Sequence, residues 1–139
     1  MSIIAITRRS LVAVALVGLA ASAMMSSRSH AQGATHVPFT AEAFAKAQAD
    51  GKSILLDVTA PWCPTCKTQK PIIDSLTQFQ PLDKMMVFAI DFDSQKDTLR
   101  VLKVSQQSTL IAFKGKTETA RSVGDTKPES IATLMKSAI

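Results

Sequence analysis

The two cysteines of this 139-residue chain, Cys63 and Cys66, lie three residues apart, a spacing that suits either redox chemistry or metal binding. A structural disulfide usually closes a longer loop, because a short loop removes little conformational entropy from the unfolded chain. Thiol–disulfide exchange needs a reactive thiolate and a second thiol close enough to resolve the mixed disulfide. The pair therefore predicts a dithiol that is oxidised and reduced in turn.

The residues after the first cysteine predict a helix that begins at or near Cys63. Apolar residues such as Ile73 and Leu76 recur at helical spacing, and Pro64 suits the first turn, where its missing N–H needs no partner. The unpaired N–H groups and the positive end of the helix dipole favour a negatively charged sulfur there. We expect Cys63 to be the accessible attacking thiolate and Cys66, one turn deeper, to be the more shielded resolving thiol.

Asp57 is the candidate proton acceptor. It precedes Cys63 by six residues and lies in a near-continuous apolar run, residues 53–59, which predicts a strand buried on both faces. Alternation along this strand places the carboxyl group inside, and burial raises the pKa of a carboxyl group. Asp57 would then take the proton of Cys66 while that thiol attacks the mixed disulfide. The alternative interpretation is an exposed aspartate at the end of the strand.

Metal binding is the competing use of two neighbouring cysteines. Structural zinc normally has four ligands, and the one histidine after residue 31 is His36, far from the pair in the sequence. A zinc site is therefore not expected, and we predict no metal ligand and no small-molecule cofactor. Cu(I) accepts two thiolates, so a periplasmic Cu(I)-binding chaperone stays open as the alternative function.

The first 31 residues have the form of a signal peptide. Two arginines precede an apolar run over residues 11–23, and Ser29 and Ala31 offer a cleavage signal. The apolar run is shorter than the about 20 residues that span a bilayer, so the protein would meet the membrane only through an uncleaved signal. We expect a periplasmic protein with residues 1–31 as signal peptide and residues 32–139 as one domain, which acts as a monomer.

The charge balance excludes nucleic acid as a partner. The whole chain carries a net charge of +5, but three of its sixteen basic residues precede the cleavage signal. The rest of the chain has thirteen basic and eleven acidic residues and no basic cluster interleaved with aromatic residues. A polyanionic partner is therefore not expected.

The elements that must position the cysteines alternate between helices and strands, which is typical of an α/β domain. The last helix has Thr126 and Glu129 at the spacing of a capping box. A short strand is expected before Phe39, with further strands over residues 53–59, 85–91, 109–113 and 118–123, and helices over residues 41–50, from about 63 onward, over 94–103 and from 126 onward.

Taken in chain order, several residues around the cysteines resemble those of the thioredoxin family. Asp57, residues 60–67 (Ala-Pro-Trp-Cys-Pro-Thr-Cys-Lys) and Pro71 resemble its buried acid, its active site and the proline of its active-site helix. The resemblance extends from about Phe39 to the end of the chain. It implies the thioredoxin fold, a mixed central β-sheet flanked by helices, and a thiol–disulfide oxidoreductase that exchanges a Cys63–Cys66 disulfide with partner proteins.

Two departures from the family concern the surroundings of the cysteines. The family places a cis-proline where this chain has Ser108. A cis bond without proline costs about 3 kcal/mol, so we expect a trans peptide and a reshaped loop at Ser108. Ala89 stands where many thioredoxins carry a lysine paired with the buried acid, so the pKa of a buried Asp57 should be higher here.

Five residues are expected to contact a partner protein or to shape the surface that it binds: Trp62, Pro64, Thr65, Ser108 and Thr109. Trp62 either covers the edge of the core or offers an apolar platform to the partner. The Pro64-Thr65 pair is similar to that of periplasmic reductants that serve cytochrome c maturation, and the segment before it resembles the periplasmic domain of membrane thiol-electron transporters. Both resemblances imply a reducing role, with such a transporter as a candidate partner.

Overall fold

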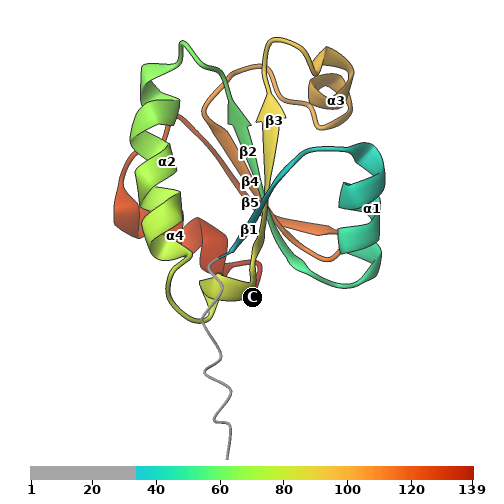
Figure 1. Ribbon diagram of the computed structural model, residues 1–139, viewed down its shortest axis with the longest axis vertical. Helices are drawn as coiled ribbons and strands as arrows, with labels where there is room; N and C mark the ends of the chain where they lie inside the picture. The colour runs from blue at the N-terminus through green and yellow to red at the C-terminus, as the bar shows by residue number, and fades with distance from the viewer. Residues whose placement is uncertain (1–33) are drawn as a thin grey trace, which may run out of the picture.

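The computed structural model describes residues 34–139 (Figure 1), so the predicted signal peptide, residues 1–31, lies outside the described residues. No helix in the described part is both long and apolar enough to cross a bilayer. The elements along the chain are β1 (Thr35–Pro38), α1 (Ala41–Ala49), β2 (Ser53–Thr59), α2 (Pro64–Leu76), the 3₁₀ helix η1 (Leu82–Lys84), β3 (Met86–Asp91), α3 (Lys96–Val101), β4 (Thr109–Lys114), β5 (Thr117–Val123) and α4 (Pro128–Lys136).

The five strands form one mixed sheet in the order β1-β3-β2-β4-β5. Strands β1 and β2 pair with β3 in parallel, whereas β4 is antiparallel to both β2 and β5. β2 is the central strand, and its apolar residues are fully buried, as the near-continuous apolar run over residues 53–59 predicts. The expected α/β class and mixed sheet are confirmed.

Helices cover both faces of the sheet, with α2 and α4 on one side and α1 and α3 on the other (Figure 1). Successive side chains of β2 point to opposite faces. Leu55 belongs to the apolar cluster under α2 and α4, together with Ile73 and Ile131, whereas Leu56 belongs to the cluster under α1 and α3, together with Phe88. Asp57 therefore shares its face with Leu55 and α2.

The sequence predicts the start of α1 correctly but not the start of α3. Thr40 is the N-cap of α1, and its hydroxyl oxygen accepts a hydrogen bond of 3.1 Å from the backbone N–H of Ala43. The predicted start of α3 at Ser94 is wrong, because the Asp91 carboxylate accepts the backbone N–H of Ser94 at 2.7 Å and holds it in a turn. The helix begins only at Lys96.

The predicted capping box of the last helix is also wrong. α4 begins at Pro128, so the N-cap is Lys127 and Thr126 lies one residue too early to cap it. Instead, the carboxylate of Asp125 accepts a hydrogen bond of 3.0 Å from the backbone N–H of Lys127 and another from the hydroxyl of Ser130. The side chain of Asp125 thus closes the loop that leads into α4.

Candidate functional site

The two cysteines lie where the chain leaves β2 and enters α2. Cys63 is the N-cap of α2 and Pro64 its first residue, so the predicted helix start is confirmed. Cys63 and Cys66 form a disulfide with their Cα atoms 5.3 Å apart, and the sulfur of Cys63 accepts a hydrogen bond of 3.1 Å from the backbone N–H of Cys66. One of the free N–H groups at the helix start is therefore directed at the Cys63 sulfur.

The disulfide is more deeply buried than the sequence predicts. Cys63 is 1% exposed and Cys66 is 5% exposed, and both pack with Ala60 and Phe92. The expectation that Cys63 is the more accessible cysteine is therefore wrong for the disulfide-bonded protein. The reason is the N-cap geometry, which folds the Cys63 sulfur back onto the first turn of α2.

A groove of about 550 Å³ opens on the Cys66 side of the disulfide, between the end of β2 and α2. Cys66 lines it, but Cys63 does not. Its charged lining residues are Lys67, Lys70, Asp74 and Asp91. The groove therefore places solvent and charges of both signs beside the second cysteine.

Asp57 is a half-buried residue of β2 whose side chain faces α2. Its Oδ1 atom is buried and has no hydrogen-bond partner, which excludes the alternative of a fully exposed aspartate. Burial raises the pKa of Asp57 to about 6, a shift that Lys70 opposes and Asp74 reinforces. Its neighbour on β3 is the exposed Ala89, so no lysine is present at that position.

The loop at Ser108 lies beside the end of β2, where the carbonyl oxygen of Val58 also approaches Cys66. The one cis peptide bond within residues 34–139 is Gln80–Pro81, so Ser108 follows a trans bond, and its φ of 55° lies in the left-handed region. Its backbone N–H donates a hydrogen bond of 2.7 Å to the carbonyl oxygen of Val58, which lies 3.9 Å from the Cys66 sulfur. The expected trans peptide is confirmed, and the reshaping of the loop relative to the family stays a prediction.

The hydroxyl groups of this loop bond to the loop itself. Ser108 donates to the carbonyl oxygen of Gln107 at 2.6 Å, and Thr109 donates to that of Gln106 at 2.7 Å. Both residues are buried. These bonds fix the backbone of the loop, and the hydroxyl hydrogen of Ser108 is already bonded.

Gln69 is a residue of this site that the sequence reasoning missed. It is completely buried on α2, one turn after Cys66, and its side-chain amide donates to the carbonyl oxygens of Ser108 (3.2 Å) and Asp125 (2.8 Å). Its own carbonyl oxygen has no partner. Its spacing of three residues from Cys66 was the one sequence signal, because it places a polar side chain on the inner face of the helix.

Trp62 lies on the surface beside the disulfide. Its side chain is 55% exposed, and its indole N–H donates a hydrogen bond of 2.7 Å to the Asp93 carboxylate. Trp62 is therefore not part of the buried core, and its role toward a partner stays a prediction. Pro64 is exposed as well, and Thr65 is half-buried. These three residues surround the disulfide at the start of α2.

The described residues do not assemble a conventional metal centre. Within residues 34–139, no group of three or more His, Cys, Asp or Glu side chains is placed to hold a metal ion. The two cysteine sulfurs are bonded to each other. What the arrangement offers chemically is a disulfide at a helix start, a groove beside it and a carboxyl group of raised pKa.

Comparison with known proteins agrees with this geometry. The family model for thioredoxin matches residues 35–137. A thioredoxin of Chlamydia trachomatis is 34% identical over 94 residues, covering 68% of this chain and 89% of that protein. The H-type thioredoxin of Fagopyrum esculentum is 34% identical over 88 residues, covering 63% and 74%.

Solved structures extend the agreement to three dimensions. The crystal structure of Trxlp from Edwardsiella tarda is 39% identical, with a TM-score of 0.71, and the match covers 73% of this chain and 98% of that one. The fold is therefore the thioredoxin fold. The family match, these relatives and the Cys63–Cys66 pair at the start of α2 lead to one conclusion: the chain belongs to the thioredoxin family and is a thiol–disulfide oxidoreductase.

Proposed function

We propose that this protein is exported to the periplasm and reduces disulfides of partner proteins, with Cys63 as the attacking thiolate and Cys66 as the resolving thiol. The observation that carries the assignment of roles is the hydrogen bond from the Cys66 N–H to the Cys63 sulfur at the start of α2. In the reduced protein the same N–H and the helix dipole stabilise a thiolate at Cys63.

The proposed reaction transfers two electrons to the partner. The Cys63 thiolate attacks one sulfur of the partner disulfide, which forms a mixed disulfide and releases the other partner sulfur as a thiolate. Cys66 then loses its proton to Asp57 and attacks the Cys63 sulfur. The Cys63–Cys66 disulfide forms, and the second partner thiolate leaves. Asp57 later passes the proton to solvent.

Asp57 suits the role of proton acceptor because its pKa of about 6 lies close to physiological pH. A general base works best when its pKa is near the working pH, since it must be ionised before the step and protonated after it. An ordinary exposed aspartate has a pKa of about 3.9 and accepts a proton less readily at neutral pH.

The proposed partner surface surrounds the disulfide. Trp62 and Pro64 present exposed apolar area, Thr65 lies between them and Cys66, and the Ser108–Thr109 backbone bounds the site on the other side. The proposed reductant acts as a monomer and needs no cofactor, so its own disulfide must be reduced by another dithiol protein. A membrane thiol-electron transporter is the proposed electron donor.

The direction of electron flow is tested by equilibrating the protein with glutathione. A potential near about −270 mV is expected for a reductant, whereas a value near about −120 mV means an oxidant and contradicts the proposal. In the reduced protein, the pH dependence of alkylation should show Cys63 titrating below about 8.5, the value of an unperturbed cysteine.

The roles of the two cysteines are tested by single serine variants. Cys66→Ser should trap a mixed disulfide between Cys63 and a disulfide substrate, because the resolving thiol is missing. Cys63→Ser should form no mixed disulfide and lose at least about 1,000-fold in exchange activity, as expected for a missing nucleophile. Trapping through Cys66 alone would reverse the assignment.

The alternative function is tested by titrating the reduced protein with Cu(I) in the absence of oxygen. Tight one-to-one Cu(I) binding, with negligible turnover of a disulfide substrate, would favour the copper chaperone.

Export is tested separately, with the full chain expressed in a bacterium that has a periplasm. The expected product is periplasmic and begins at Gln32, after removal of residues 1–31. A cytoplasmic protein that keeps these residues would contradict the proposed location and leave the redox chemistry in place.

A further inference from the structure

The side-chain amide of Gln69 joins three segments that lie far apart in the chain. Gln69 is on α2, and its side-chain nitrogen donates to the carbonyl oxygens of Ser108 at 3.2 Å and of Asp125 at 2.8 Å. Ser108 directly precedes β4, and Asp125 lies in the loop between β5 and α4. Gln69 is completely buried, so water does not compete for these two bonds. The helix that carries Cys66 therefore holds both loops through one amide group.

The backbone of Ser108 passes this restraint on to the end of β2. Its N–H donates a hydrogen bond of 2.7 Å to the carbonyl oxygen of Val58, and the same oxygen lies 3.9 Å from the Cys66 sulfur. The carbonyl oxygen of Ser108 also accepts the N–H of Gly124 at 2.9 Å. A continuous series of contacts thus leads from the Gln69 amide through Ser108 and Val58 to the sulfur of the second cysteine.

The backbone conformation of Ser108 depends on such a restraint. Its φ of 55° lies in the left-handed region, which residues other than glycine rarely adopt. A conformation of this kind persists where the surrounding contacts fix it. The hydroxyl of Ser108 bonds only one residue back, to the carbonyl oxygen of Gln107. The bond from Gln69 therefore ties this unusual conformation to the helix that carries Cys66.

The Val58 carbonyl oxygen opposes ionisation of Cys66 in the reduced protein. It is a weak hydrogen-bond acceptor for the neutral Cys66 thiol, and its partial negative charge repels the thiolate. The hydrogen of the Ser108 N–H lies against the same oxygen and offsets part of that charge. The Cys66 thiolate is therefore formed more readily while Ser108 keeps its N–H on Val58.

We propose that Gln69 is a positioning residue for the step in which Cys66 resolves the mixed disulfide. By holding the Ser108 carbonyl group, Gln69 keeps the Ser108 N–H on the Val58 oxygen, and the Cys66 thiolate forms and attacks faster. Attack by Cys63 does not depend on this contact, because its sulfur accepts the N–H of Cys66. This inference rests on the proposed function for the assignment of Cys66 as the resolving thiol.

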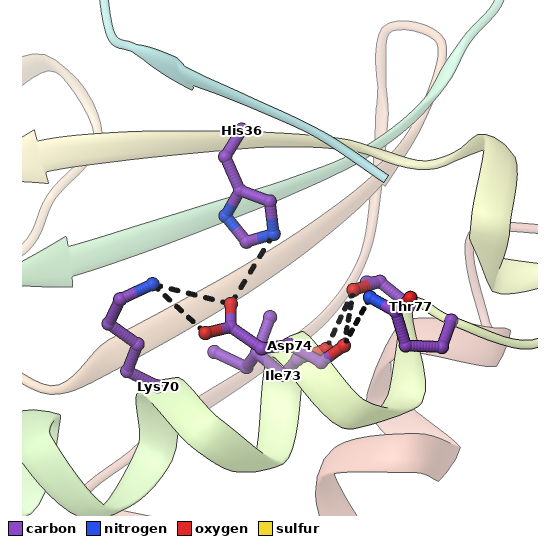
Figure 2. A network of polar contacts seen from close by, with 6 residues as sticks. His36, Lys70, Ile73, Asp74 and Thr77 are labelled. Carbon is purple, nitrogen blue, oxygen red and sulfur yellow. Dashed lines mark hydrogen bonds and ion pairs between the residues drawn. The ribbon is translucent and has the colours of Figure 1, made fainter. Parts of the chain in front are cut away.

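Thr77, at the other end of the same helix, offers a matched control. It is the C-cap of α2 and is fully buried, and its hydroxyl lies 3.0 Å from the carbonyl oxygens of Ile73 and Asp74. Figure 2 shows these contacts at the end of α2. Thr77→Val removes a buried hydroxyl from the helix and leaves the bonds of Ser108 in place. A general loss of helix stability would therefore appear in this variant as well.

The first experiment measures amide hydrogen exchange by NMR in the disulfide-bonded protein. Gln69→Met keeps an unbranched side chain of similar length that donates no hydrogen bond. The amide of Ser108 should then exchange about tenfold faster relative to that of Ile111, which is fully buried in β4, whereas Thr77→Val should leave this ratio unchanged. An unchanged ratio in Gln69→Met would overturn the inference.

A shorter side chain at the same position supplies a second variant. Gln69→Asn keeps a buried amide but lacks one methylene group, so it cannot reach both carbonyl oxygens from the same backbone position. The exchange ratio should rise in this variant too. It tests the same contact even where Gln69→Met does not fold.

The second experiment follows the two chemical steps by stopped flow, with dithiobis-nitrobenzoate as the disulfide. Attack by Cys63 on one sulfur of the reagent forms a mixed disulfide and releases one coloured thiolate. Cys66 then loses its proton, attacks the Cys63 sulfur, closes the protein disulfide and releases the second coloured thiolate. The rate of the first release rises with the reagent concentration, whereas that of the second, intramolecular release does not. The two steps are thereby measured separately.

Gln69→Met should slow the second release by about threefold and leave the first unchanged. The thiolate fraction of Cys66 falls, and the higher nucleophilicity of the remaining thiolate offsets only part of that loss. Equal slowing of both releases, or the same slowing in Thr77→Val, would overturn the inference. Slowing of the first release alone would uphold the action of Gln69 on Cys66 and refute the proposed role of Cys63 as the attacking thiolate.

Discussion

The two faces of the sheet are built in contrasting ways. Under α1 and α3, four phenylalanines pack with ring centroids 5.3 to 6.1 Å apart. Under α2 lie the disulfide, the groove, the half-buried Asp57 and the buried Gln69, and each of these two side chains has a buried oxygen that lacks a hydrogen-bond partner. The four phenylalanines are Phe39, Phe44, Phe88 and Phe113.

This difference shows how one strand serves stability and chemistry at once. β2 alternates between the faces, so Leu56 and Val58 enter the aromatic side while Asp57 enters the side of α2. Buried apolar area stabilises the fold, whereas a buried carboxylate without a full set of partners destabilises it. We call the face under α1 and α3 the aromatic face and the face under α2 the redox face. The apolar burial on the aromatic face therefore offsets the free-energy cost of the polar groups on the redox face.

The largest expected effect on stability is that of Phe88→Ala on the aromatic face. Phe88 is fully buried, so its removal should lower the free energy of unfolding by about 3–5 kcal/mol, measured by urea denaturation of the disulfide-bonded protein. The midpoint of a pH titration of Asp57, followed by NMR of its carboxyl carbon, should stay unchanged, because Phe88 lies on the opposite face. A loss below about 1 kcal/mol would mean that this face is not the main source of stability.

The second prediction concerns the cost of the carboxylate on the redox face. The pKa of Asp57 is raised in the folded protein, so the unfolded chain releases this proton first, and stability falls as the pH rises from about 4 to about 6. Asp57→Asn removes this loss. Its free energy of unfolding at about pH 7.5 should exceed that of the unaltered protein by up to about 3 kcal/mol.

The pH dependence supplies the check on this prediction. Below about pH 4 the Asp57 carboxyl is protonated in both states, so the gain from Asp57→Asn should disappear there. Urea denaturation at a series of pH values measures the difference. A gain of the same size at all pH values would show that packing, and not ionisation, separates the two proteins.

Ser108→Pro should have the third-largest effect on stability, because it strains the loop that bonds to the end of β2 beside Cys66. Proline requires a φ near about −65° and has no N–H, whereas Ser108 has a φ of 55° and donates to Val58. A loss of about 2–3 kcal/mol in the free energy of unfolding is expected. Ser108→Gly is the control, since glycine accepts this φ and keeps the N–H. Equal stability of both variants would show that the loop adopts another backbone with proline.

Trp62→Ala should have the smallest effect on stability. The side chain is 55% exposed and its indole hydrogen bond to Asp93 lies at the surface, so the loss should stay below about 1 kcal/mol. If Trp62 is the platform for a partner protein, KM for that partner should rise by about threefold to tenfold while kcat changes little. A lower kcat with an unchanged KM would place Trp62 in the chemical step instead.

Features that depend on neighbours in the sequence were predictable. The apolar run of β2, the Thr40 cap of α1 and the helix start at Cys63 follow from side-chain alternation, from a polar residue before a helix and from a proline in the first turn. The cysteine spacing also predicted disulfide exchange. Each of these features lies within one short stretch of the chain, so the sequence determined it without knowledge of the packing.

Features that join distant segments were decided only by the tertiary structure. Gln69 bonds to Ser108 and Asp125, and His36 meets Asp74, although these partners lie 38 to 56 positions apart in the chain. The sequence carries no local signal for such contacts, because they depend on how α2 packs against the sheet. The same packing leaves Asp57 half-buried beside the groove. The sequence thus determined that the two thiols exchange a disulfide, and the packing around α2 decided which charges surround the carboxyl group beside them.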